Sequence, residues 1–183
     1  MNALVLSGGG GKGAYQIGVW KALRKLHYKI DIVTGTSVGA LNAVLVTQKS
    51  YFLAPRIWNK IDFKEVFQDD TKRVQTIKET ISMYGKNIIK NKGMSTDNLE
   101  KKLEEAINKR KFYKSKIKFG LVTFNITNLK PKVLTKDKIP KDKLKDYLMA
   151  SATCFPAFKM KNIDGDNYID GGYYDVLPIN LAI

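Results

Sequence analysis

The sequence predicts an α/β fold, specifically a three-layer α/β/α sandwich around a mainly parallel central sheet. An apolar run at Ala3–Leu6 enters a glycine-rich loop, continues into an amphipathic helix from Ala14 to about Leu26, and reaches a second apolar run that begins at Ile30. Strand, loop, helix and strand in this order form a βαβ unit, whose two strands are parallel. The second strand leads directly into another apolar helix, from Val38 to about Thr47.

The rest of the chain alternates helical and extended patterns. Residues 50–115 are mostly polar with helical periodicity, and we expect a variable, mainly helical insertion or cap there. Its clearest helix begins at Ser95-Thr96-Asp97, with Glu100 placed to close a capping box. The pattern then predicts a core strand at Ile117–Ile126, a turn at Asn128–Pro131, a partner strand at Lys132–Thr135, a helix at Lys141–Ala152, and a hairpin in which Asp164-Gly165 joins Phe158–Ile163 to Asn167–Ile169.

Length and composition predict a single globular domain over residues 1–183. A chain of this size can bury a substantial core, and its 44% hydrophobic content argues against disorder. No apolar run approaches the roughly 18 residues of a membrane span, and the first apolar run lacks the basic segment of a signal peptide. The lone Cys154 cannot form an internal disulfide. We therefore expect a cytoplasmic protein.

The formal net charge is +15, from 32 Lys and Arg against 17 Asp and Glu. The excess gathers in residues 109–118 and again in residues 130–145. Such a charge favours anionic partners, so peripheral attachment to an anionic membrane and a merely solvated lysine-rich surface stay open as alternatives. Zinc-ligand spacing and the aromatic signature of RNA-binding sheets are both missing, and nucleic acid is not an expected partner.

The glycine loop that follows the first strand, Ser7–Gly13, allows three interpretations. A phosphate-binding P-loop needs Ser or Thr after its lysine, and Gly13 stands there instead. A dinucleotide site fits Gly8, Gly10 and Gly13 but needs an acidic residue at the end of the second strand, where Thr34 stands. An oxyanion hole, in which bare backbone N–H groups face a developing negative charge, is the interpretation we favour.

The second strand ends in Gly35-Thr36-Ser37-Val38-Gly39, the pattern of a nucleophile elbow. A serine at such a turn has an exposed hydroxyl on strained backbone, while the flanking glycines allow strand and helix to approach closely. The helix that begins at Val38 directs its positive N-terminal end toward the same place. Because the glycine loop and the elbow both follow parallel strands, they share one edge of the sheet.

Ser37 needs a proton acceptor to act as a nucleophile. The single histidine, His27, lies at the end of the first helix, at the edge of the sheet opposite the elbow, so we expect it to be structural or to cap the helix. A carboxylate must then be the base, and Asp170 is the best candidate because it follows an apolar strand and precedes Gly171 and Gly172. Burial there would raise its pKa and make it a stronger base.

Together these motifs resemble the patatin-like phospholipases over Ala3–Pro178. The resemblance implies a Ser–Asp dyad hydrolase: Ser37 attacks an acyl ester, Asp170 takes the proton and later activates water, and Gly8, Gly9 and Gly10 hold the oxyanion. It implies a phospholipid or other acyl-ester lipid as substrate and no metal or other cofactor. The residues that carry the resemblance are Gly8–Gly11, Lys12 and Gly13, then Gly35, Ser37 and Gly39, then Ala150, Ser151 and Pro156, and finally Asp170, Gly171 and Gly172.

Family members normally continue beyond Asn180 with a further helix and strand. We therefore expect a C-terminally truncated domain whose exposed sheet edge favours self-association. Two other functions stay open: a non-catalytic basic module that binds lipid or phosphate, and a dinucleotide-binding enzyme. Tyr15, Met94, Cys154 and Phe155 are candidates for an acyl pocket, although core packing is the favoured role for each.

Overall fold

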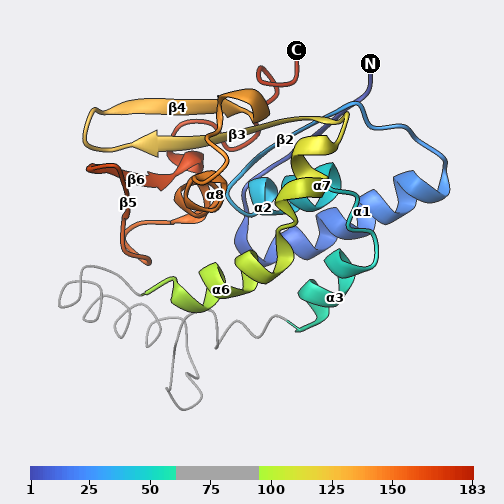
Figure 1. The fold of residues 1–183 in the computed structure, drawn as a ribbon, viewed down its shortest axis with the longest axis horizontal. Coiled ribbons are helices and arrows are strands. Elements are labelled where there is room, and N and C mark those ends of the chain that lie inside the picture. Colours follow the sequence, from blue (N-terminus) through green and yellow to red (C-terminus); the bar gives the residue numbers. More distant parts are fainter. Residues whose placement is uncertain (61–94) are drawn as a thin grey trace.

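The computed structural model describes residues 1–60 and 95–183 (Figure 1). These residues form a six-stranded sheet with helices packed against it, which confirms the α/β class. The strands are β1 (Ala3–Leu6), β2 (Ile32–Thr36), β3 (Lys118–Asn125), β4 (Lys130–Thr135), β5 (Lys161–Ile163) and β6 (Asp166–Asp170). The helices are α1 (Gly13–Lys25), α2 (Val38–Thr47), α3 (Leu53–Lys60), α6 (Asp97–Ala106), α7 (Lys109–Lys114) and α8 (Leu144–Ala152), with short 3-10 turns at Gly10–Lys12, Lys136–Lys138 and Gly171–Tyr173.

The sheet is mixed, with the order β1-β2-β3-β6-β5 and β4 paired to β3. Among the described strands, the β1-β2 and β2-β3 pairs are parallel, whereas β4, β5 and β6 pair antiparallel, so the parallel character expected for most of the sheet belongs to its first three strands. The length of the connections explains two of the antiparallel pairs. Short turns join β3 to β4 and β5 to β6, and a short turn reverses the chain.

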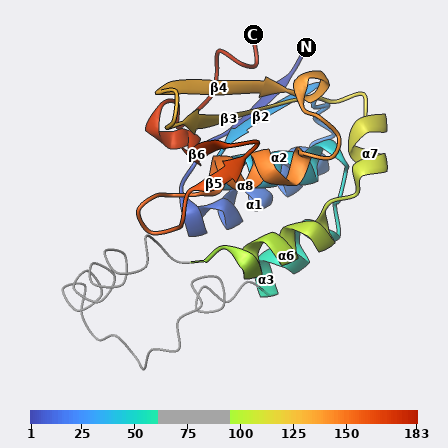
Figure 2. The same ribbon diagram turned by 60° about the vertical axis from the view of Figure 1, so that its left-hand side comes forward.

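The described helices lie on one side of the sheet, as both views show (Figure 2). Successive side chains of β2 point to opposite faces of the sheet, and the two faces have different partners. Val33 belongs to the core on the helical side, whereas the hydroxyls of Thr34 and Thr36 donate hydrogen bonds to the carbonyls of Pro178 and Asp175 at 3.0 and 2.8 Å. The C-terminal segment around Asp175 and Pro178 therefore lies against the second face of the sheet at β2.

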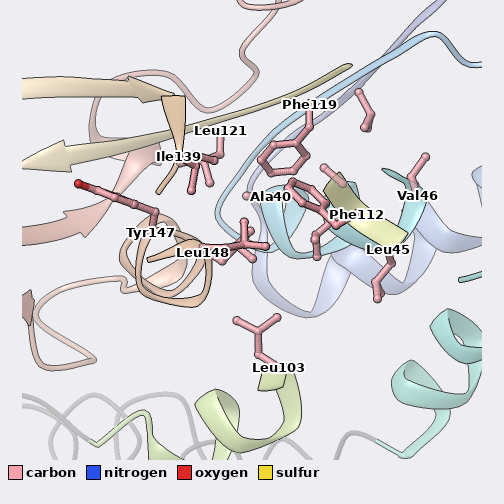
Figure 3. Close-up of a cluster of buried hydrophobic side chains, with 14 of the residues drawn as sticks. Ala40, Leu45, Val46, Leu103, Phe112, Phe119, Leu121, Ile139, Tyr147 and Leu148 are labelled. Atoms are coloured by element: carbon pink, nitrogen blue, oxygen red, sulfur yellow. The ribbon is translucent and has the colours of Figure 1, made fainter. Parts of the chain in front are cut away.

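The core lies between the sheet and the layer formed by α2 and α8 (Figure 3). Phe112 of α7 is fully buried and packs edge-on against Phe119 of β3, with ring centroids 5.0 Å apart. Leu121 of β3 and Leu148 of α8 are equally buried. Each such side chain contributes about 1.5–3 kcal/mol by leaving water. This cluster fixes the helical layer against the strands that carry the candidate site.

The predicted insertion, residues 50–115, is helical in α3, α6 and α7, and residues 61–94 of it lie outside the described residues. One expected detail is wrong. The helix begins in the expected stretch, but its N-cap is Thr96, so Glu100 stands one position too far along to close a capping box. Its carboxylate instead accepts a hydrogen bond from the Thr96 hydroxyl at 3.0 Å and pairs with Lys161, also at 3.0 Å.

Candidate active site

The ends of β2 and β6 meet against neighbouring residues of β3. Thr36, the last residue of β2, pairs with Val122, and Asp170, the last residue of β6, pairs with Thr123. Residues 120–125 of β3 pair with β4 on their other edge, so β2 and β6 share one edge and run toward each other. Ser37 follows Thr36 directly. The sheet register thus brings Ser37 and Asp170 together from positions far apart in the sequence.

Ser37 has the backbone of a nucleophile elbow, with φ 57° and ψ −132°. A non-glycine residue in such a region stores about 1–3 kcal/mol of strain, which the surroundings must hold in place. The N–H of Ser37 donates to Ser151 Oγ at 2.9 Å, and that hydroxyl donates to the Val122 carbonyl at 2.6 Å. Ser151 belongs to α8 and is fully buried. Its two hydrogen bonds therefore join the elbow to both α8 and β3.

The two flanking glycines are required by close backbone approach. A Cβ on Gly35 would lie 2.3 Å from the Gly39 carbonyl oxygen, and a Cβ on Gly39 would lie 2.2 Å from the Leu6 carbonyl oxygen. Any larger residue would push α2 away from β1 and β2. The elbow prediction is thus confirmed in geometry.

Asp170 is almost completely buried, with 6% of its surface exposed. Burial raises the pKa of its carboxyl above the usual value, while hydrogen bonds from the Ser37 side chain and the Gly172 N–H act in the opposite direction. The Gly172 N–H lies 2.7 Å from Asp170 Oδ1 and sets the orientation of the carboxylate. Gly171 must lack a side chain, because a Cβ there would lie 2.1 Å from the Val122 carbonyl oxygen.

The glycine loop lies directly beside the elbow. A Cβ on Gly8 would be 3.2 Å from Ser37 Cβ and 3.9 Å from its Oγ. The Gly8 N–H donates to the Val176 carbonyl at 3.0 Å, so this group is already occupied. Gly9 and Gly10, with φ values of 150° and 55° that favour glycine, are the remaining candidates of the loop for binding an oxyanion.

The residues after the loop anchor it to the helices. Gly11 and Lys12 are exposed in the 3-10 turn, whereas Gly13 is buried. A Cβ on Gly13 would lie 2.5 Å from a Val38 methyl and 2.6 Å from the Trp58 ring. This contact requires glycine at the point where α1 crosses α2 and α3.

A network of hydrogen bonds around Asn42 supports the glycine loop. The sequence analysis did not identify it. Asn42 donates to the Gly13 carbonyl and to Gln16 Oε1, both at 2.9 Å, and accepts from Trp58 Nε1 at 2.9 Å. Gln16 in turn donates to the Ser7 carbonyl at 2.7 Å. A buried amide must satisfy its donors and acceptors, so Asn42 fixes the relative positions of α1, α2 and α3.

An apolar cavity of about 150 Å³ opens beside Ser37. Two helices line it with residues at i, i+3, i+4 and i+7 spacing, namely Val38, Leu41, Asn42 and Leu45 of α2 and Leu99, Lys102, Leu103 and Ala106 of α6. Gly10, Ile57, Trp58, Ala152 and Phe158 also line it. The helical spacing of these residues can be seen in the sequence. Only the fold shows that the row of residues on α2 and the row on α6 line the same cavity.

Three of the four candidates that the sequence offered for an acyl pocket, Tyr15, Cys154 and Phe155, do not line this cavity. Core packing, the role favoured for each of them, is wrong for Tyr15, which is 78% exposed, and for Cys154, which is also exposed. Met94 lies outside the described residues. His27 is exposed before the start of β2, whereas Ser37 follows its end, so the two lie at opposite ends of that strand as expected.

The family of the chain follows from comparison with known proteins. A family model described as patatin-like phospholipase matches residues 4–183. The chain belongs to this family. Its membership confirms the resemblance that the glycine loop, the elbow and the Asp170 segment indicated.

Two relatives of this patatin-like chain illustrate the range of the family. Rat patatin-like phospholipase domain-containing protein 7 is 27% identical over 193 residues, which cover 98% of this chain and 12% of the rat protein. The probable lipid hydrolase 463L of Invertebrate iridescent virus 6 is 27% identical over 188 residues, which cover 98% of this chain and 62% of the viral protein. The chain thus spans less than two thirds of either relative.

The patatin-like fold is also found in a solved structure. VipD from Legionella pneumophila superimposes with a TM-score of 0.63 at 17% identity, over 95% of this chain and 46% of VipD. Within residues 1–60 and 95–183 of this patatin-like chain, no helix combines the length and apolar character that crossing a bilayer requires.

Proposed function

We propose that the chain is a lipid acyl hydrolase that cleaves carboxylic esters through a Ser37–Asp170 dyad. The observation that carries this proposal is the meeting of β2 and β6 on β3, which brings a buried carboxylate to a strained, glycine-flanked serine. No histidine lies at the elbow, because the single one is at the opposite end of β2. Asp170 is therefore the base.

The first half of the reaction forms an acyl-enzyme. Ser37 Oγ attacks the acyl carbonyl as Asp170 accepts the hydroxyl proton. Burial raises the pKa of Asp170, which makes its carboxylate a stronger proton acceptor. The Gly9 and Gly10 N–H groups, together with the positive end of α2, stabilise the oxyanion. The C–O bond of the ester then breaks, and the alcohol leaves with the proton from Asp170.

The second half releases the fatty acid. Asp170, again ionised, takes a proton from water as the water oxygen attacks the acyl carbonyl. The ester bond to Ser37 Oγ breaks, and the proton returns to this oxygen. Free acid and the original dyad result, so no metal or cofactor is needed to balance the step.

The cavity beside Ser37 supports a lipid substrate. Leucine and isoleucine side chains of α2, α3 and α6 surround it, and their apolar surface would favour an aliphatic acyl chain over water. An acyl chain in the cavity would leave its carbonyl at the elbow and its alcohol portion toward the exposed glycine loop. A phospholipid, a lysophospholipid or a neutral lipid ester satisfies this arrangement.

Reaction with a fluorophosphonate probe tests the proposal, since such probes label activated serines. We expect labelling of the intact chain and none of Ser37→Ala. Asp170→Asn should label much more slowly, because the base is lost. An intact chain that neither labels nor hydrolyses any of a panel of acyl esters would contradict the assignment.

A further inference from the structure

A second concave site lies at the other end of α2 from Ser37. It is a groove of about 1010 Å³ between the end of α1, the segment after α2, and α7. Its lining includes Val46, Thr47 and Gln48 from the C-terminal end of α2, whereas Ser37 is the N-cap of that helix. A ten-residue helix is about 15 Å long, so the groove is separate from the candidate active site.

The groove is strongly basic because the fold gathers cations from distant segments. Arg24, Lys29 and Lys49 line it on the side of α1 and α2. Arg110, Lys111, Lys114 and Lys116 line it on the side of α7. Of the carboxylates in the described part of the chain, Asp31 alone lies in the lining. Among residues 1–60 and 95–183, Lys29 is the single one of these seven cations that forms an ion pair, with Asp31 at 2.9 Å.

The groove is also held in a fixed shape. Gln48 is buried, donates to the Ala106 carbonyl at 2.7 Å and accepts from the Asn108 N–H at 2.9 Å, which fastens the start of α7 to the end of α2. On the other side, the Arg24 guanidinium lies 3.5 Å from the centre of the Tyr51 ring. A cation such as Arg24 that is held in place before a ligand arrives loses less entropy when it binds that ligand.

We propose that this groove binds a compact ligand that carries several phosphate groups, either free in solution or as the headgroup of an anionic lipid. Guanidinium and ammonium groups form charge-assisted hydrogen bonds with phosphate oxygens, and several cations facing one space favour a multiply charged ligand. The groove is concave, and the residues that line it include the buried Trp20 and Ile117. These features fit a headgroup-sized ligand better than an extended nucleic acid, which needs a long positive track.

The test compares two triple variants with the same change in charge. Arg110→Gln, Lys111→Gln and Lys114→Gln remove three cations from the groove. Lys130→Gln, Lys132→Gln and Lys138→Gln remove three exposed cations from outside it, on and beside β4. Calorimetric titration with inorganic tripolyphosphate, and sedimentation with phosphatidylcholine vesicles that contain a phosphoinositide with two ring phosphates, measure binding near physiological salt. Lys49→Glu, on another segment, provides a second groove variant.

We expect saturable binding that weakens about tenfold or more in the groove triple and in Lys49→Glu, and less than about threefold in the control triple. Binding of tripolyphosphate alone would identify a free ligand, and binding of vesicles alone a lipid headgroup. Equal losses in both triples, no saturable binding of either probe, or tighter groove-dependent binding of single-stranded RNA would overturn the proposal. Ser37→Ala should bind both probes normally, so the result is independent of the hydrolase function.

Discussion

Thr36 and Asp170 are the last residues of two strands that run toward each other along one edge of β3, where they pair with the adjacent residues Val122 and Thr123. This pairing sets the position of Ser37, the residue after Thr36, relative to the buried carboxylate. Because Thr36, Val122 and Thr123 are all buried, the backbone pairing that sets the distance between serine and aspartate lies inside the protein. The proposed dyad is therefore rigid before substrate binds.

Removing either member of the dyad should abolish hydrolysis. We expect Ser37→Ala and Asp170→Asn each to lower kcat on an acyl ester by about 10³-fold or more, and the double variant to lose little beyond that, because the two residues act as a unit. His27→Ala is the control and should hydrolyse esters normally. Activity that survives in Asp170→Asn but disappears in His27→Ala would refute the dyad.

Ser151 should act by positioning Ser37. Ser151→Ala leaves the Ser37 N–H and the Val122 carbonyl without their partner, which should cost about 1–3 kcal/mol in the free energy of unfolding and lower kcat more than it raises KM. Thr47→Val is the matched control, since it removes a buried hydroxyl that bonds the Ala43 carbonyl at the far end of α2. An equal fall of kcat in both variants would show that Ser151 matters only for stability.

The raised pKa of Asp170 predicts two pH effects. In activity, kcat/KM should rise with pH along an acidic limb whose midpoint lies above 3.8, the ordinary value for an aspartate. In stability, a raised pKa means that the folded protein favours the protonated carboxyl, so this stabilising contribution is complete below 3.8 and is lost as pH rises through the raised pKa. Denaturant unfolding should accordingly show Asp170→Asn gaining stability over the intact chain as pH rises. A difference that stays constant with pH would contradict burial as the cause.

Glycines in this chain should differ sharply in their tolerance of a methyl group. Gly39→Ala places a Cβ 2.2 Å from the Leu6 carbonyl oxygen and should lower the free energy of unfolding by several kcal/mol, with loss of activity. Gly18→Ala, in the middle of α1, meets nothing within 4 Å and should stabilise the protein by about 0.5–1 kcal/mol. Thermal unfolding of both variants measures the contrast, and similar melting temperatures would speak against the close contact of α2 with β1.

The cavity beside Ser37 should determine acyl-chain preference. Leu41→Trp would fill it, so kcat/KM should fall about tenfold or more for long-chain esters and change little for an acetyl ester. Leu26→Trp, at an exposed position after α1, is the control and should hydrolyse both substrates normally. Equal losses on long and short esters would place the acyl chain elsewhere.

The sequence alone determined the first part of this fold, from β1 through α2. The apolar runs at β1 and β2, the glycines between them and the periodicity of α1 and α2 depend on neighbours in the chain, and the structure has these elements within one or two residues of the predicted bounds. The elbow at Ser37 could be predicted for the same reason, since its strain and its glycines lie within a few residues. Asp170 was identified by residue type and by family resemblance, without its spatial relationship to Ser37.

Only the tertiary structure decided that relationship and the rest of the site. The antiparallel run of β6 toward β2, the hydrogen bond that occupies the Gly8 N–H with Val176, the link through Ser151 and the rows of residues on α2 and α6 that line one cavity all join residues that are distant in sequence. The basic groove likewise combines cations whose positions in the sequence do not predict a common surface. Such contacts depend on sheet register and on which faces are buried together, and those follow from the packing of the whole chain rather than from any local pattern.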